Sequence, residues 1–275
     1  MMKRPTLLLM ILILAFIFLF FLLNLLLGSV HIPFGKIWDL LWGTGVASTP
    51  DVMSNQEIIW SNIIWKSRVP QALTALVAGA GLSVSGLQMQ TVFRNPLAGP
   101  SVLGISSGAS LGVACVVLLS GAMGGVALSR LGYMGEVALS VAAIIGALSV
   151  MALIVYVSQK VKGNVTLLII GVMIGYVASA IIGVLKYFSV EEDIRAYVIW
   201  GLGSFARVSG DQMLLFVCIM AVLLPLSFLL IKTMNLLLLG DGYARNLGLN
   251  IKRARLLVIS CSGVLVAIVT AYCGP

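Results

Sequence analysis

Two neighbouring cations, Lys66 and Arg68, are the residues of this chain best suited to binding chemistry. A guanidinium is a rigid fork of donors that holds a carboxylate with two parallel hydrogen bonds, and an ammonium adds a compact positive charge. Both residues precede a long apolar stretch, so they could bind an acidic partner at its edge. The alternative is that each snorkels, with its stem on the apolar stretch and its charge in water.

Residues for catalysis or ion coupling are missing from the sequence. There is no GxxxxGK[ST] phosphate loop, and the single histidine, His31, excludes a His-rich metal cluster. Apolar stretches carry no isolated acid in their middle, whereas ion-coupled carriers usually need such a carboxylate or a broken-helix ion site. We therefore expect a chain that is not an enzyme, binds no cofactor or metal itself, and is powered from elsewhere.

Small residues recur four apart in two series. They are Gly104, Gly108 and Gly112 in the first, and Gly171, Gly175, Ser179 and Gly183 in the second. This spacing gives a helix one stripe of small side chains, which allows close helix packing in lipid. Tight packing is one interpretation, and the lining of a wide, weakly polar passage is the other.

The elements that position these residues are membrane helices. The 275 residues are 60% hydrophobic and 9% charged, which indicates a polytopic all-α membrane protein. Residues 6–27 would span roughly 33 Å as a helix, about the thickness of a bilayer core. The run is also longer than the apolar region of a signal peptide. The sequence predicts spans at about 6–27, 70–91, 101–120, 134–158, 166–188, 212–231 and 254–273.

Charge asymmetry predicts a cytoplasmic N-terminus. With that orientation the inner segments carry ten Lys and Arg against one acid, and the outer segments carry seven against eight acids. This is the positive-inside distribution, so the net charge of +8 gives no reason to expect nucleic acid as a partner.

Two connecting segments have features of their own. The outer segment 189–211 contains an apolar part too short to span, which predicts a short helix near the mouth of a pathway. The inner segment 232–255 carries leucines that a solvated loop would not expose without reason, and its glycines divide it into short pieces. We expect one or two short helices there that contact a protein partner; an interfacial amphipathic helix is the alternative.

Several separated motifs resemble the FecCD-type permeases, the membrane subunits of binding-protein-dependent ABC importers for iron-siderophores, haem and cobalamin. The motifs are Arg68-x-Pro70, Gly79-Ala80, Ser85-Gly86, Gln90, Arg94-Asn95-Pro96-Leu97-Ala98-x-Pro100, Leu103-Gly104, Gly108-Ala109, Trp200, Gly203-Ser204, Asn235-Leu236-Leu237, Leu239-Gly240, Ala244 and Leu247-Gly248. They cover the chain from about Trp65 onward.

The resemblance implies a single permease domain over 1–275 in the bacterial inner membrane, with the inverted-repeat, ten-helix fold. It implies two ATPase subunits that use ATP and Mg, a periplasmic binding protein, and a second permease copy or related permease, all within membrane lipid. Segment 232–255 would be the coupling loop, with Asn235, Leu236, Leu239, Gly240, Ala244, Arg245, Leu247 and Gly248. Arg68, helped by Lys66, would dock the binding protein; the second small-residue series with Trp200, Gly203 and Ser204 would shape the pathway.

Two departures from the family pattern qualify this prediction. Gln71 stands where members often carry a second arginine, and the chain provides about seven of ten spans, which suggests C-terminal truncation. The predicted function is import of a metal chelate (ferric siderophore, haem or cobalamin) into the cytoplasm. The alternative is a non-transporting truncated or regulatory homologue.

Overall fold

The computed structural model describes residues 4–28, 30–42, 55–122, 133–161, 164–208 and 210–275. Across these ranges the chain is helical and contains no strand. It divides into two compact units, one made of residues 1–76 and 205–214 and the other of residues 77–204 and 215–275.

Unit 1 holds the N-terminal helices. They are α1 (Arg4–Leu26), α2 (Phe34–Trp42), α3 (Asn55–Ile63), the π-helix η2 (Ile64–Arg68), the first residues of α4 (Val69–Phe93) and the short 3-10 helix η5 (Phe205–Arg207). Its core is a small cluster of Ile32, Ile37 and Ile64. Along α1 nearly every apolar side chain from Leu7 to Phe20 is exposed, as expected for a helix that faces lipid.

Unit 2 holds the remainder of α4 and all later α-helices. They are α5 (Ile105–Ala122), preceded by the 3-10 helix η3 (Pro100–Leu103), α6 (Tyr133–Lys160), α7 (Asn164–Tyr187), α8 (Glu191–Gly201), α9 (Asp211–Phe228) from Leu215 onward, α10 (Ile231–Leu238), α11 (Asp241–Asn246) and α12 (Ile251–Cys273).

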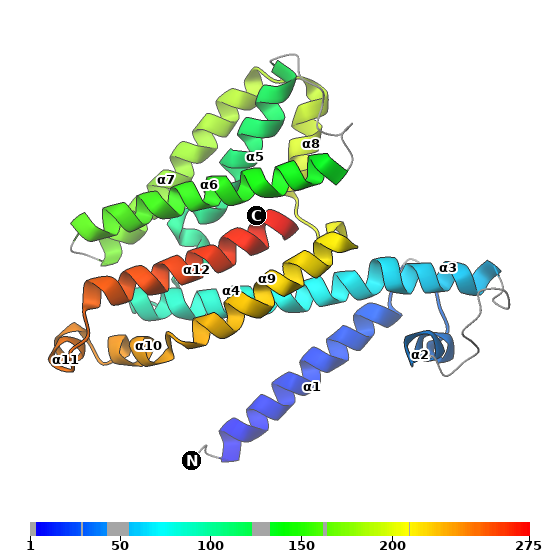
Figure 1. The fold of residues 1–275 in the computed structure, drawn as a ribbon, viewed down its shortest axis with the longest axis horizontal. Coiled ribbons are helices and arrows are strands. Elements are labelled where there is room, and N and C mark those ends of the chain that lie inside the picture. The colour runs from blue at the N-terminus through cyan, green and yellow to red at the C-terminus, as the bar shows by residue number, and fades with distance from the viewer. Residues whose placement is uncertain (1–3, 29, 43–54, 123–132, 162–163, 209) are drawn as a thin grey trace. The chain divides into compact units, whose positions relative to one another are not determined.

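The C-terminal helix α12 is the centre of unit 2. It packs against α6, α5, α10 and α11, and Figure 1 shows it running beside α6. In its most apolar window 72% of the residues are buried, against 22% for α6 and α7. Two serines tie it to α4, because the hydroxyls of Ser85 and Ser262 lie 2.5 Å apart and each also meets the other's backbone carbonyl.

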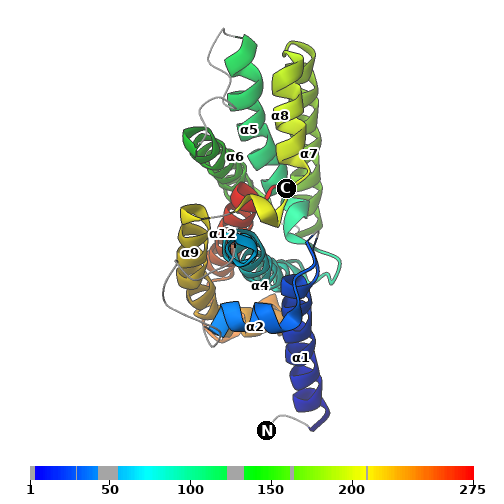
Figure 2. The same cartoon turned by 90° about the vertical axis from the view of Figure 1, so that its right-hand side faces the viewer.

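Helix α5 packs against α6, α7 and α8, which lie around it in Figure 2. Its glycines face backbone: a Cβ on Gly108 would lie 2.7 Å from the carbonyl oxygen of Gly146, and one on Gly104 would lie 2.8 Å from that of Gly171. The first small-residue series therefore serves tight packing.

A helix lies at every predicted span, with three differences in extent. The span predicted at 70–91 belongs to one helical run, Asn55–Phe93. The span predicted at 101–120 begins only at Ile105, because Gly104 has φ +73° and ends η3. The span predicted at 212–231 ends at Phe228, where the chain bends by 47° into α10.

By length and composition five helical runs in the described residues could cross a membrane, or six if the bent pair is one span. Helix α5 is apolar but shorter.

Candidate functional site

The Arg94-Asn95-Pro96 break forms a rigid turn at the end of α4. Arg94 adopts φ +48°, the one non-glycine residue with positive φ in the described ranges. The Asn95 side chain accepts a hydrogen bond from the Leu97 amide at 2.9 Å, and Gln90 donates to the Pro96 carbonyl at 3.1 Å. The asparagine supplies its own turn and the proline cannot continue the helix, so the sequence fixes this geometry locally.

Asp241 joins this turn to two other elements. Its carboxylate accepts from Arg94 at 2.6 Å and from Arg255 at 2.7 Å, and Arg94 also donates to the Leu237 carbonyl at 3.1 Å. The end of α4, the α10–α11 junction and the start of α12 are thus connected by one shared carboxylate. The three side chains are 24–43% exposed, so each ion pair adds only modest stability by itself.

The segment predicted as a coupling loop contains two short helices, in agreement with the one or two expected. Helix α11 ends in a Schellman motif: Gly248 donates to the Arg245 carbonyl, Leu249 donates to the Ala244 carbonyl, and Gly248 has φ +85°. Asn250 then caps α12 by accepting from the Arg253 amide at 3.2 Å. These caps explain why glycine and asparagine stand at these positions.

This segment exposes a set of large apolar side chains, here called the apolar face. They are Leu238 (61% exposed), Leu239 (61%), Tyr243 (72%) and Leu247 (60%). Leu97, in the turn held by Arg94, is 87% exposed. An exposed apolar surface of this kind, next to a charged network, is typical of a protein contact.

The residues predicted for the coupling loop divide between surface and interior. Leu239, Leu247, Asn235, Arg245 and Gly248 are exposed; Leu236 and Gly240 are partly buried, and Ala244 is fully buried. Sequence reasoning missed Tyr243 and Leu97 as exposed residues, although both lie in or beside the quoted motifs, and it left Leu238 out of the predicted coupling residues. Exposure within a run of leucines depends on the helix phase, which the bend after α9 sets.

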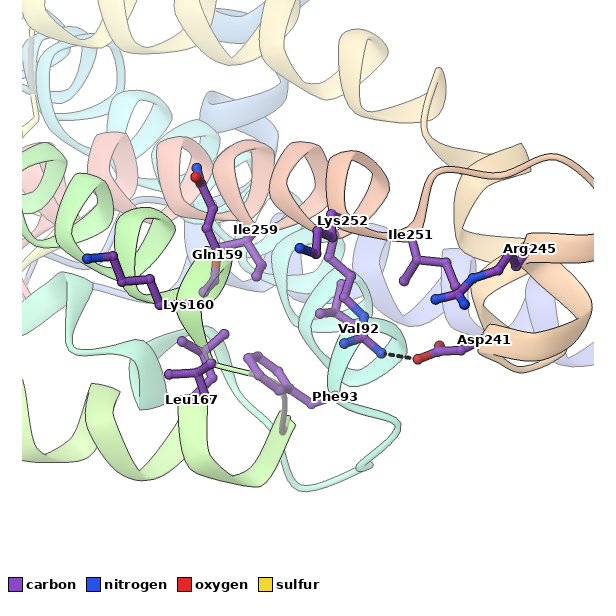
Figure 3. A pocket seen from close by; sticks show the side chains of 13 residues that line it. Val92, Phe93, Gln159, Lys160, Leu167, Asp241, Arg245, Ile251, Lys252 and Ile259 are labelled. Atoms are coloured by element: carbon purple, nitrogen blue, oxygen red, sulfur yellow. Dashed lines mark hydrogen bonds and ion pairs between the residues drawn. The ribbon is translucent and has the colours of Figure 1, made fainter.

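A pocket of about 360 Å³ adjoins the Asp241 network (Figure 3). Four cations contribute to its lining, namely Lys160, Arg245, Lys252 and Arg255, with Asp241 as the acid among them. The dashed line at Asp241 in Figure 3 marks its ion pair with Arg255. Apolar side chains such as Phe93, Leu167 and Ile259 form most of the remaining wall, together with the polar Ser158 and Gln159.

Arg68 makes contacts that the sequence did not predict. Its side chain is 6% exposed and donates to the Leu25 carbonyl at 2.7 Å, the Leu26 carbonyl at 3.2 Å and the Val30 carbonyl. The guanidinium therefore caps the C-terminal end of α1, where carbonyls lack helical partners. A docking role would need an exposed fork, whereas the Arg68 side chain is buried in the structure. Gly28 permits this contact, since a Cβ there would lie 2.7 Å from the guanidinium.

Lys66 is exposed, as docking would require. In the same unit Lys36 donates to Glu57 at 2.6 Å, and this hydrogen bond and the charge of Glu57 raise the pKa of Lys36. That bond links α2 to α3.

Trp200, Gly203 and Ser204 belong to a buried junction in unit 2. Trp200 is 2% exposed, Gly203 has φ +67°, and the Ser204 amide donates to the Cys273 carbonyl at 2.8 Å. A Cβ on Gly274 would lie 2.6 Å from the Cα of Gly203. The segment that follows α8 is therefore hydrogen-bonded to the end of α12 and packs closely against it.

The second small-residue series is packed against other residues at one end of α7 and open at the other. A Cβ on Gly171 would lie 2.7 Å from the Val102 carbonyl oxygen, and one on Gly175 would lie 3.3 Å from the Ser107 hydroxyl. A Cβ on Gly183 would meet nothing within 4 Å, and Ser179 is exposed. One end of the stripe packs and the other end is open.

The model of the FecCD transport family matches residues 13–275. The chain belongs to the FecCD transport family. Two characterised relatives of this FecCD chain are permeases. It is 34% identical to the hemin transport system permease protein HmuU of Yersinia pestis, over 90% of this chain and 68% of the relative. It is 35% identical to the vitamin B12 import system permease protein BtuC of Klebsiella pneumoniae, over 77% of this chain and 60% of the relative.

A solved structure described as an inward-facing metal-chelate type ABC transporter resembles the FecCD chain with a TM-score of 0.67. Sequence identity to it is 30%, over 87% of this chain and 73% of that one. The all-helical fold of a permease, predicted from the motifs, is therefore confirmed.

Proposed function

We propose that this FecCD chain is the membrane-spanning subunit of an ABC importer that carries a metal chelate from the periplasm into the cytoplasm. The proposal includes an inner-membrane location with the N-terminus inside, and ATP hydrolysis with Mg on separate partner subunits. The single observation that carries it is the apolar face on the family's coupling segment, tied by Asp241 to α4 and α12.

The connection at Asp241 supplies a physical route for coupling. A partner that moves α10 and α11 must displace the Asp241 carboxylate, and with it Arg94 at the end of α4 and Arg255 at the start of α12. Because α12 is largely buried, its movement must repack α5 and α6. Packed helix interfaces switch between discrete arrangements rather than deforming continuously, which suits alternating access.

The open side of α7 fits a pathway between two permease copies. Tyr176 and Val177 are 66% and 60% exposed, and Ser179 and Gly183 continue the small stripe toward the outer end. A second copy facing this surface would enclose a wide, weakly polar passage. Such a passage holds its cargo loosely, in keeping with a binding protein that supplies the affinity.

Docking of the binding protein would rest on Lys66 rather than Arg68. Lys66 is exposed beside Trp65, which is 50% exposed, and an ammonium suits an acidic lobe. The proposed cargo is a class of compound, the metal chelates. The names of the relatives give haem and cobalamin as cargo, and ferric siderophores belong to the same chelate class.

The test is ATP-dependent uptake in a deletion strain that carries either the complete gene or a variant. Leu239→Asp introduces a charge into the apolar face and should lower uptake roughly tenfold or more, because interface centres tolerate charge poorly. Asn246→Asp adds the same charge at an exposed polar position of α11 and should leave uptake near wild type. Equal uptake in both variants would contradict the proposed coupling surface.

A further inference from the structure

The pocket beside Asp241 carries more positive charge than the described residues neutralise. Of its four cations, Arg255 is paired with Asp241, and Asp241 is shared with Arg94. Neither Arg245 nor Lys252 forms an ion pair with any described residue, and the Arg255 Nε is a buried donor without a hydrogen-bond partner there. An anion is the ligand that this arrangement lacks.

Backbone dipoles add to this positive potential. The first residue of α12, Ile251, lines the pocket, and so does Leu167 in the first turn of α7. The N-terminal turns of two helices therefore adjoin the same cavity, and the helix dipoles add partial positive charge there. Lys160 stands at the end of α6, with its ammonium 4.5 Å from the centre of the Tyr156 ring.

Most of the remaining wall is apolar, with Ser158 and Gln159 as its polar members. Phe93, Leu167 and Ile259 come from three helices whose ends meet at this level, next to a cationic rim. A free phosphate ion makes no favourable contact with an apolar wall. A phospholipid does, because its glycerol and acyl chains can pack against these side chains while its headgroup binds the cations. Basic pockets between spanning helices at the cytoplasmic side suit anionic lipid headgroups.

We propose that this pocket binds the phosphate headgroup of an anionic phospholipid of the inner leaflet. Arg245 and Lys252 are the principal phosphate ligands, with Arg255 as a further donor. Such a lipid would bridge α6, α11 and α12 and so influence the coupling segment. The proposal requires the membrane orientation given above but not the transport activity, so lipid binding is measured without transport.

The experiment is a native mass-spectrometry titration of the purified full chain with phosphatidylglycerol, and with phosphatidylcholine as the zwitterionic comparison. The variant Arg245→Gln/Lys252→Gln should bind phosphatidylglycerol roughly 30-fold more weakly, at the energy typical of two cations near a membrane surface. Lys232→Gln/Arg253→Gln removes the same charge outside the pocket lining and should bind as wild type. The charge-conserving variant Arg245→Lys/Lys252→Arg should retain most of the affinity for phosphatidylglycerol. It keeps the proposal testable if the double-glutamine variant of the pocket folds poorly.

Three results would overturn the proposal. Equal loss in both double-glutamine variants would mean a diffuse charge effect, and equal affinity for phosphatidylcholine would mean no headgroup recognition. Displacement of the lipid by millimolar inorganic phosphate, or by an added ATPase subunit, would assign the pocket to a free anion or to a protein contact.

Discussion

At the residue scale, Asp241 and Arg68 show how one side chain can organise several elements. Asp241 accepts from two arginines that are far apart in the sequence. Arg68 donates to the carbonyls of Leu25 and Leu26 at the end of α1 and to that of Val30 just beyond it. Both sets of contacts use charge-assisted hydrogen bonds, which are stronger than neutral ones. The difference is exposure: the Asp241 pairs are partly solvated, while Arg68 is buried.

Asp241→Asn should weaken the network modestly. The amide keeps the shape but loses the charge, so we expect a loss of about 1 kcal/mol in unfolding free energy, smaller at high salt. Thermal unfolding of the purified protein at two salt concentrations measures this. Glu192→Gln, an exposed acid on α8, is the matched control and should change little. A salt-independent loss would contradict an ion-pair role.

Arg68→Lys should destabilise the protein by about 2 kcal/mol, because an ammonium cannot reach three carbonyls and buried charge-assisted bonds are costly to lose. Gly28→Ala should act through the same contact and add little when combined with Arg68→Lys. Thermal unfolding measures both changes. If Arg68→Lys instead leaves stability intact and lowers affinity for a binding protein, the docking role is right and the capping role is secondary.

At the element scale, the stripe of small residues on α7 has two functions along one helix. Gly171 faces the backbone of η3, while Gly183 faces open space. The spacing of four residues is the same at both ends, so sequence periodicity could not separate packing from exposure. Gly146 on α6, which contacts Gly108 of α5, was not singled out from the sequence because it belongs to neither series.

Gly171→Ala and Gly183→Ala form a matched pair on this helix. The first places a methyl group against backbone atoms and should cost about 1–3 kcal/mol, as overpacking does. The second meets no atom and should be neutral or stabilising by up to about 1 kcal/mol, since alanine favours helix. Thermal unfolding in detergent distinguishes them. Similar losses for both variants would mean that α7 packs along its whole length.

At the scale of the whole molecule, membership of the FecCD family and the likeness to a solved permease support import of a chelate. The matched region spans 60% of the vitamin B12 permease and 68% of the hemin permease.

Uptake of radiolabelled ferric siderophore, haem and cobalamin, offered separately to a deletion strain, should show loss of one label. The complete gene should restore that label, and ATP depletion should abolish the restored uptake. A strain that takes up all three labels normally, with no redundant system present, would exclude an import role for these cargoes.

The sequence alone predicts the class of protein, the approximate spans, the turn at Asn95-Pro96 and the short helices of segment 232–255. These features depend on local properties: apolar length, the missing proline donor, and glycine or asparagine at helix ends. Only the tertiary structure decided that Arg68 caps α1, that Asp241 is shared by Arg94 and Arg255, and which leucines form the apolar face. Those features depend on which distant segments meet, and periodicity within one helix carries no record of its neighbours.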